Sequence, residues 1–204
     1  MKKTIAFLLA MMMLLALAGC SSGDAGSGGN SDSQASQPAQ ASEPAQASEP
    51  AQASEPAAAG NHVVDYTIDV PDGFELTEME GITACWYNAD GSNINLNITD
   101  KDATTDIGFP AITGDMLRMT LISTFKETYG VEPTITDKYF TRNDVCGMPA
   151  YQYSYEMDLE GAEMTQIIVC INADKVYTVT YTDGSGTWLE DFEASAANIQ
   201  LVTE

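Results

Sequence analysis

The stretch that decides the fold is AYQYSYEMDLEGAEMTQIIVCINADKVYTVTYTD, residues 150–183. Its first part alternates polar residues with Tyr151, Tyr153 and Tyr155, which predicts a half-buried strand with the tyrosines in the core. Residues 163–172 carry apolar side chains at both parities, so we expect a central strand buried on both faces. Residues 175–183 form a third strand, and the short turns between the three indicate antiparallel pairing.

Further strands precede this stretch. Residues 62–74 alternate apolar and polar side chains up to the turn at Pro71, which predicts a strand with Val64, Tyr66, Ile68 and Val70 facing inward. ITACWYN (82–88) and NINLNIT (93–99) flank an Asp-Gly turn and read as a hairpin. In the second of these strands we expect Ile94, Leu96 and Ile98 in the core, and Asn93, Asn95, Asn97 and Thr99 in water.

Two helices complete the pattern. Thr113 or Asp115 can cap a helix that Gly130 closes, with an apolar stripe formed by Leu117, Leu121, Phe125 and Tyr129 and widened by Met116 and Ile122. A second helix is expected from Thr187 to about Ile199, with Trp188, Phe192 and Ala196 on one face. TITDKYFTR (134–142) is a weaker extended stretch. The predicted class is α+β, an antiparallel sheet flanked by helices.

The segment before residue 61 differs in composition from the rest. Residues 1–19 begin Met-Lys-Lys and continue as an apolar run too short for a comfortable permanent anchor, which predicts a secretory signal peptide. Residues 20–60 are rich in Gly and Ser and then repeat ASEPAQ, without large aliphatic or aromatic side chains. We therefore expect a disordered tether, spanning about 35 Å as a coil and about 120 Å as a polyproline II rod, before a globular domain at 61–204.

The charge of the chain limits its partners. The formal net charge is −22, with 30 acidic residues against 8 basic ones. Such a charge repels polyphosphates and anionic surfaces, so we expect no nucleic-acid partner. The charge suits cationic partners, and acidity also simply keeps secreted proteins dispersed.

The sequence contains no complete catalytic motif. The chain has one histidine, His62, at the tether boundary, so no Ser-His-Asp or Cys-His arrangement can be built in the interior. Ser185 sits in a Gly-Ser-Gly turn, and no P-loop or GxGxxG is present. Asn88 to Ser92 imitates the opening of a calcium loop, but the required later Gly and Glu are replaced by Asn93 and Thr99. We expect no catalytic residues, no cofactor and no metal site; a carboxylate-dependent hydrolase remains a third alternative.

Three of the four cysteines lie in the globular domain, and one lies before it. Cys85, Cys146 and Cys170 form no CxxC pair, which argues against a zinc site. One disulfide with a free thiol, or buried reduced thiols, are both compatible with their positions. The fourth, Cys20, stands alone where the apolar run ends.

Two resemblances follow from these residues. Leu17-Ala18-Gly19-Cys20 resembles the lipobox of bacterial lipoproteins, which implies that Cys20 is lipidated and anchors the chain to the outer face of the cytoplasmic membrane. Residues 63–203 are similar to the PsbP-like, DcrB-like group, on the features YTIDVPDGFEL, GMPAYQYSYEM, VYTVTYTD and WLEDFEASAANIQL. Phe74 stands where many relatives carry Trp. This resemblance implies an antiparallel sheet between helices in an accessory or binding protein.

These observations predict a membrane-anchored extracytoplasmic lipoprotein without catalytic activity. Its domain is expected to bind a protein or a component of the cell envelope, and the membrane contact is made through Cys20. The alternative is a domain that binds a small ligand or a metal ion.

Overall fold

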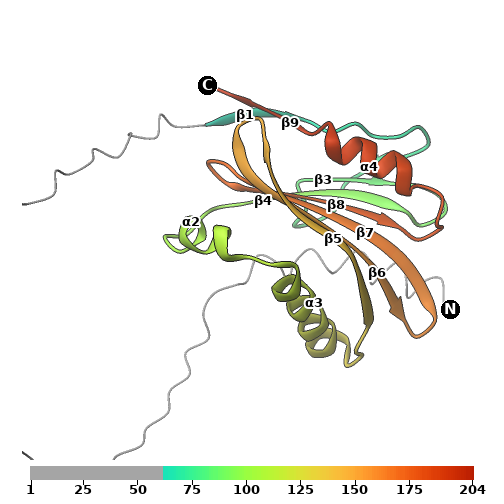
Figure 1. The fold of residues 1–204 in the computed structure, drawn as a ribbon. Coiled ribbons are helices and arrows are strands. Elements are labelled where there is room, and N and C mark those ends of the chain that lie inside the picture. Colours follow the sequence, from blue (N-terminus) through green and yellow to red (C-terminus); the bar gives the residue numbers. More distant parts are fainter. Residues whose placement is uncertain (1–61) are drawn as a thin grey trace, which may run out of the picture. The chain divides into compact units, whose positions relative to one another are not determined.

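The computed structural model describes residues 62–204 (Figure 1). Seven strands form one antiparallel sheet in the order β2-β3-β4-β8-β7-β6-β5, and β1 and β9 form a separate two-stranded ribbon. The strands of the sheet are β2 (Glu75–Thr77), β3 (Ala84–Tyr87), β4 (Asn93–Thr99), β5 (Thr134–Val145), β6 (Met148–Leu159), β7 (Ala162–Asn172) and β8 (Val176–Asp183). The ribbon consists of β1 (Val63–Thr67) and β9 (Gln200–Thr203).

The three strands predicted from residues 150–183 are β6, β7 and β8. Leu159 pairs with Ala162 and Asn172 with Val176, so each turn is a tight antiparallel connection. Glu160 and Gly161 both have positive φ, 53° and 81°, which is the conformation of a two-residue hairpin whose twist matches the strands. β7 lies between β6 and β8, which confirms the expectation of an internal strand buried on both faces.

The weak extended stretch near residue 134 proves to be a full strand. β5 is 12 residues long and pairs with β6 along its whole length, with an irregularity between Asp137 and Tyr139. Its side chains are mostly exposed because β5 is an edge strand, so the apolar alternation that marks a buried strand is diluted.

Helices cover both faces of the sheet, which confirms the predicted α+β class. α3 (Gly114–Tyr129) packs Leu117, Leu121 and Phe125 against a cluster that includes the tyrosines of β6. α4 (Leu189–Ala197) packs on the other face. Ile167 and Ile168 belong to different clusters, as expected for adjacent residues of one strand, and this places the two helices on opposite sides.

The ends of α3 confirm its predicted caps. The Thr113 side chain accepts a hydrogen bond from the backbone N–H of Met116, and Gly130 follows the helix with φ of 71°. Met116 does not widen the buried stripe, because 46% of it is exposed. The short segments α2 (Thr105–Gly108) and η3 (Phe109–Ala111) lead from β4 into this helix.

The C-terminal end and β1 differ from the prediction. α4 ends at Ala197, and the following residues form β9, which pairs with β1. An irregularity between Val63 and Asp65 turns Val64 outward, so 46% of it is exposed although Tyr66 still packs on the core. A β-bulge interrupts strict alternation in this way.

The polar face of β4 was predicted to be in water, but only its second half, Asn97 and Thr99, keeps exposed surface. Asn93 and Asn95 have no exposed surface, whereas Ile94 and Leu96 on the other face are buried as expected. Their amides bond to each other, and Asn95 also accepts from Cys85. The amides thus satisfy part of their hydrogen-bonding capacity locally, which alternation in the sequence cannot reveal.

No helix within residues 62–204 is long and apolar enough to cross a membrane.

Candidate functional site

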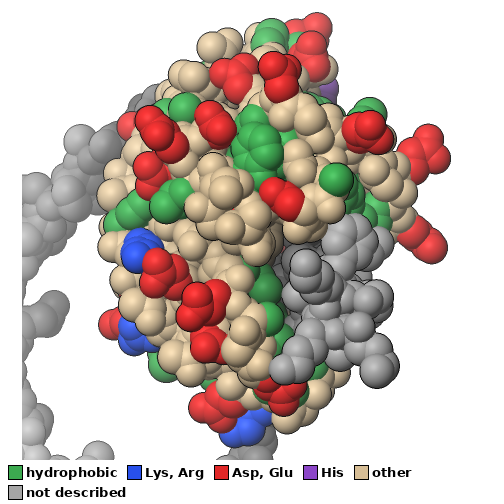
Figure 2. Space-filling view, turned by 90° about the vertical axis from the view of Figure 1, so that its right-hand side faces the viewer, with side chains coloured by type: hydrophobic (Ala, Val, Ile, Leu, Met, Phe, Trp, Pro, Cys, Tyr) green, Lys and Arg blue, Asp and Glu red, His purple; other side chains and the backbone are tan. Residues whose placement is uncertain are grey.

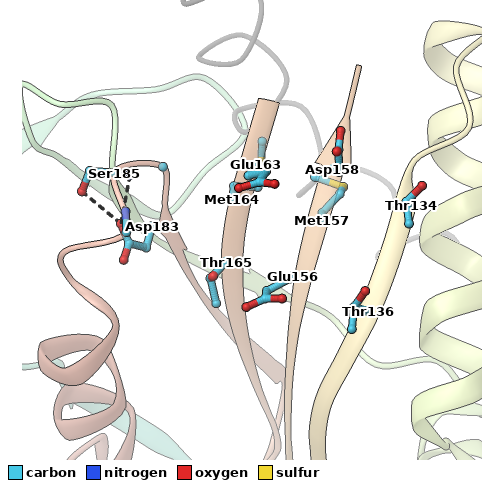
Figure 3. A pocket seen from close by; sticks show the side chains of 12 residues that line it. Thr134, Thr136, Glu156, Met157, Asp158, Glu163, Met164, Thr165, Asp183 and Ser185 are labelled. Atoms are coloured by element: carbon cyan, nitrogen blue, oxygen red, sulfur yellow. Dashed lines mark hydrogen bonds between the residues drawn. The ribbon is translucent and has the colours of Figure 1, made fainter. Parts of the chain in front are cut away.

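A pocket of about 440 Å³ lies at one end of the sheet, over β5, β6 and β7 (Figure 3). Its floor consists of two cross-strand rows. In the first row Thr136, Glu156, Thr165 and Asp183 are paired in register, and in the second Thr134, Asp158 and Glu163 are paired. Residues two apart in a strand share a face, so both rows project on the same side.

The pocket is on the α4 side of the sheet but beyond the helix. Thr165 shares its face with Ile167, which belongs to the cluster that contains Phe192 of α4. The loop from Gly184 to Gly186, between β8 and α4, forms one wall of the pocket. The pocket exists because α4 covers only part of this face.

Asp183 holds the loop that forms this wall. Its residue is 2% exposed, and its Oδ1 accepts hydrogen bonds from the backbone N–H of Ser185 at 3.0 Å and of Gly186 at 2.7 Å. Its Oδ2 accepts from the N–H of Trp188 at 2.9 Å, directly before α4. The carboxylate therefore satisfies the N–H groups that a turn and a helix start leave unpaired.

The other carboxylates of the pocket are exposed. Figure 3 shows Glu156 beside Thr165 on the floor, with Asp158 and Glu163 at the strand ends. Lys138 lies 2.5 Å from Glu156, and Asp158 accepts from the N–H of Gly161 at 2.8 Å. Figure 2 shows acidic side chains spread over the visible surface and few basic ones, in keeping with the net charge of −22. The pocket thus offers a negative, hydroxyl-rich surface to a cation.

The groups needed for nucleophilic catalysis are not brought together here. Ser185 Oγ donates to Asp183 and bonds Thr187 at 2.7 Å, so it is part of the turn. His62 lies far from it, with Nδ1 3.0 Å from Asp174 in the turn between β7 and β8. Among residues 62–204 there is no group of three or more His, Cys, Asp or Glu side chains that could hold a metal ion.

His62 and the pocket lie at opposite ends of β7. Glu163 and Thr165 are at the start of this strand, and Asp174 follows its end. β7 has 11 residues and a strand rises about 3.3 Å per residue, so its ends are roughly 30 Å apart. The point where the domain begins is therefore separated from the pocket by the length of the sheet.

Several sequence predictions fall outside the part of the chain that the structure describes. These are the signal peptide at 1–19, the tether at 20–60 and lipidation of Cys20.

The turn at residues 88–92 is the predicted hairpin, in which Asn88 N–H bonds Ser92 O at 2.9 Å and Asp90 accepts from Trp188 Nε1.

The three cysteines of the domain are free thiols. Cys85 and Cys170 are buried, and Cys146 is exposed in the turn between β5 and β6. Burial raises the pKa of Cys85 to about 11 and also raises the pKa of Cys170. Of the two alternatives left open by the sequence, buried reduced thiols therefore describe Cys85 and Cys170.

Sequence reasoning missed the pocket as a site. Its signal is nevertheless present as polar residues two apart at the ends of three successive strands, which are Thr134 with Thr136, Glu156 with Asp158, and Glu163 with Thr165. Such pairs mark a polar sheet face, but they do not tell where a covering helix ends.

No known family profile matches this sequence, and no curated protein matches it. Among solved structures, the cyanobacterial PsbP protein (CyanoP) of Synechocystis sp. PCC 6803 aligns with a TM-score of 0.51 at 14% identity, covering 67% of this chain and 86% of CyanoP. A protein of unknown function from Pseudomonas aeruginosa aligns with a TM-score of 0.37 at 14% identity, covering 61% of this chain and 81% of its own length. LpqN of Mycobacterium tuberculosis, described as involved in cell envelope biogenesis, aligns with a TM-score of 0.41 at 15% identity, covering 68% of this chain and 83% of LpqN.

The architecture defines the class as an α+β domain with one antiparallel sheet between helices. Within this class the fold is PsbP-like, as the alignment with CyanoP shows. At this identity the likeness concerns the fold alone.

Proposed function

We propose that this chain is a membrane-anchored extracytoplasmic lipoprotein whose domain binds, without catalysis, a basic segment of another protein of the cell envelope. The observation that carries the proposal is the pocket over β5, β6 and β7, where Glu156, Asp158 and Glu163 share the floor with the hydroxyl groups of three threonines. In a chain with 30 acidic and 8 basic residues, such a pocket attracts lysine and arginine side chains.

The position of the pocket supports this function. The domain begins at His62, roughly 30 Å along β7 from the pocket. An anchor at Cys20, through a tether that joins the domain at His62, leaves the pocket at the distant end of the sheet. A partner can then reach it without contact with the membrane surface.

The anchor is tested by mass spectrometry of the mature protein. We expect the N-terminal residue to be Cys20 carrying a diacylglyceryl group, and we expect Cys20→Ser to release the chain from membranes. Two acyl chains hold a protein stably, whereas a single chain gives only marginal binding. An unmodified terminus, or cleavage elsewhere, would contradict the anchor.

The pocket is tested with a defined basic peptide, an oligolysine, titrated into the full chain at low and high salt. The Glu156→Gln/Glu163→Gln variant should bind it several-fold more weakly, and salt should weaken the wild type. The control variant Glu78→Gln/Glu80→Gln removes the same charge from another exposed segment and should bind nearly as the wild type does. Equal losses in both variants would show a diffuse charge effect and refute the pocket.

A further inference from the structure

The acidic pocket lies beside a free edge of the sheet. β5 is the last strand in the order β2-β3-β4-β8-β7-β6-β5, so among residues 62–204 only β6 pairs with it. In this part of the chain, the N–H and C=O groups of β5 that point away from β6 have no other backbone partner. Such an edge is a template on which another extended segment can pair.

The pocket and this edge share residues. Thr134 and Thr136 of β5 line the pocket, and both are exposed. Figure 3 shows them on the strand next to β6, where their partners in register are Asp158 and Glu156. α3 packs with Ile135 on the opposite face of the sheet, so it does not cover the pocket side. A strand added to β5 therefore projects alternate side chains over the pocket floor.

The register allows a long cationic side chain to reach from the edge to the acids. Neighbouring strands lie roughly 5 Å apart, so an added strand is roughly 10 Å from β6. Extended lysine and glutamate side chains together span this distance. Between them stand only Thr134 and Thr136, whose short side chains leave the path open.

Lys138 shows that the pocket accepts an ammonium group. Its Nζ lies 2.5 Å from Oε1 of Glu156, whose partner in register is Thr136. The irregularity of β5 between Asp137 and Tyr139 falls at this lysine. Because a bulge interrupts regular pairing, a strand beside the pocket pairs with residues 134–137 and ends near Lys138.

We propose that the basic segment of the partner binds as an additional β-strand on β5, with lysine or arginine at alternate positions facing Glu156 and Asp158. This inference rests on the proposed function and specifies the conformation and the residue spacing of the segment. The incoming cation displaces Lys138 from Glu156. A second copy of this chain is a poorer occupant, because two chains with a net charge of −22 repel each other.

The test uses the hexapeptide acetyl-Thr-Lys-Thr-Lys-Thr-Lys-amide and two isomers of it, one N-methylated on the lysines and one on the threonines. Alternate residues of a strand direct their N–H groups to opposite sides, so only one isomer loses the donors that pair with β5. Each peptide is titrated by calorimetry into the full chain in mild detergent. We expect the two isomers, which have equal charge, to differ at least tenfold in affinity. Amide hydrogen exchange of β5 should slow when the unmethylated peptide binds.

A charge variant tests the displacement of Lys138. Lys138→Gln should bind the unmethylated peptide several-fold more tightly, because Glu156 is then free. The control is Lys175→Gln, which removes the same charge from the turn between β7 and β8, where Lys175 pairs with Asp100. This control should bind nearly as the wild type does, and equal effects of the two variants would contradict the displacement.

The inference is overturned if no form of the hexapeptide binds, if the two isomers bind equally, or if the slowed amides lie outside β5. Protection of β5 that rises with protein concentration, without peptide, would identify a second copy as the occupant and would also overturn it. The oligolysine titration separates these failures from failure of the proposed function. If Glu156→Gln/Glu163→Gln weakens oligolysine binding while the isomers bind equally, the pocket stands and the strand pairing falls.

Discussion

The loop that walls the pocket depends on a single buried carboxylate, and its removal should destabilise the whole domain. Asp183→Ala deletes the acceptor for four backbone N–H groups at 2.7 to 3.3 Å, those of Ser185, Gly186, Thr187 and Trp188. A hydrogen bond to a charged group contributes about 1.5 to 3 kcal/mol, but water can replace part of this at the exposed end of the loop. We therefore expect a loss of about 3 to 5 kcal/mol in the free energy of unfolding.

Asp183→Asn gives an intermediate case. The remaining oxygen can still accept from Ser185 and Gly186, whereas the new NH₂ group faces the N–H of Trp188, so a loss of about 2 kcal/mol is expected. Urea unfolding of the full chain, followed by tryptophan fluorescence and by circular dichroism, measures both variants.

The matched control is Asp158→Ala, in the same pocket. Asp158 is exposed and accepts from the N–H of Gly161, so its loss should cost less than about 1 kcal/mol. If Asp183→Ala cost no more than Asp158→Ala, the carboxylate would not be what holds the loop and the start of α4.

Two further predictions concern thiols and acid. Iodoacetamide at pH 8 should modify exposed Cys146 and spare buried Cys85. The thiolate is the reactive form, and burial raises the pKa of Cys85 to about 11. Peptide mass spectrometry measures the labelling, and equal labelling of the two cysteines would contradict the prediction. Burial alone would raise the pKa of Asp90, but hydrogen bonds, foremost the one from Trp188, lower this pKa overall. The ionised Asp90 carboxylate therefore stabilises the fold above about pH 4, and this contribution is lost as the pH falls further. Trp188→Phe should therefore lose stability at pH 7 and differ less from the wild type near pH 3; a pH-independent difference in urea unfolding would contradict the hydrogen bond.

Strong local patterns predicted most of the fold. The alternating tyrosines of β6, the two-sided apolar run of β7 and the capped stripe of α3 each follow from contacts that one element makes with the core. β5 and β9 are harder to predict from the sequence, because an edge strand and a short terminal strand bury few side chains. Their pairing depends on partners far away in the sequence.

The burial of Asn93 and Asn95 shows a different limit of sequence reasoning. Alternation tells which residues share a face, but it does not tell which face is covered. For the same reason the sequence placed Glu156 and Asp158 on a polar face of β6 but could not reveal that α4 does not cover them and so leaves a pocket.

The pairing of β1 with β9 has a mechanical consequence. Val63 lies beside Thr203, and Glu204 N–H bonds His62 O at 3.0 Å, so the start of the domain is held by its last strand. A partner bound at the far end of β7 would pull on the domain along the direction of the long strands. The tether then pulls β1 at Val63, whereas the domain holds β9 at Gln200, which is paired with the other end of β1. The hydrogen bonds between the two strands are therefore loaded in shear, all together, and do not open one after another. This arrangement resists force with a ribbon of only two short strands.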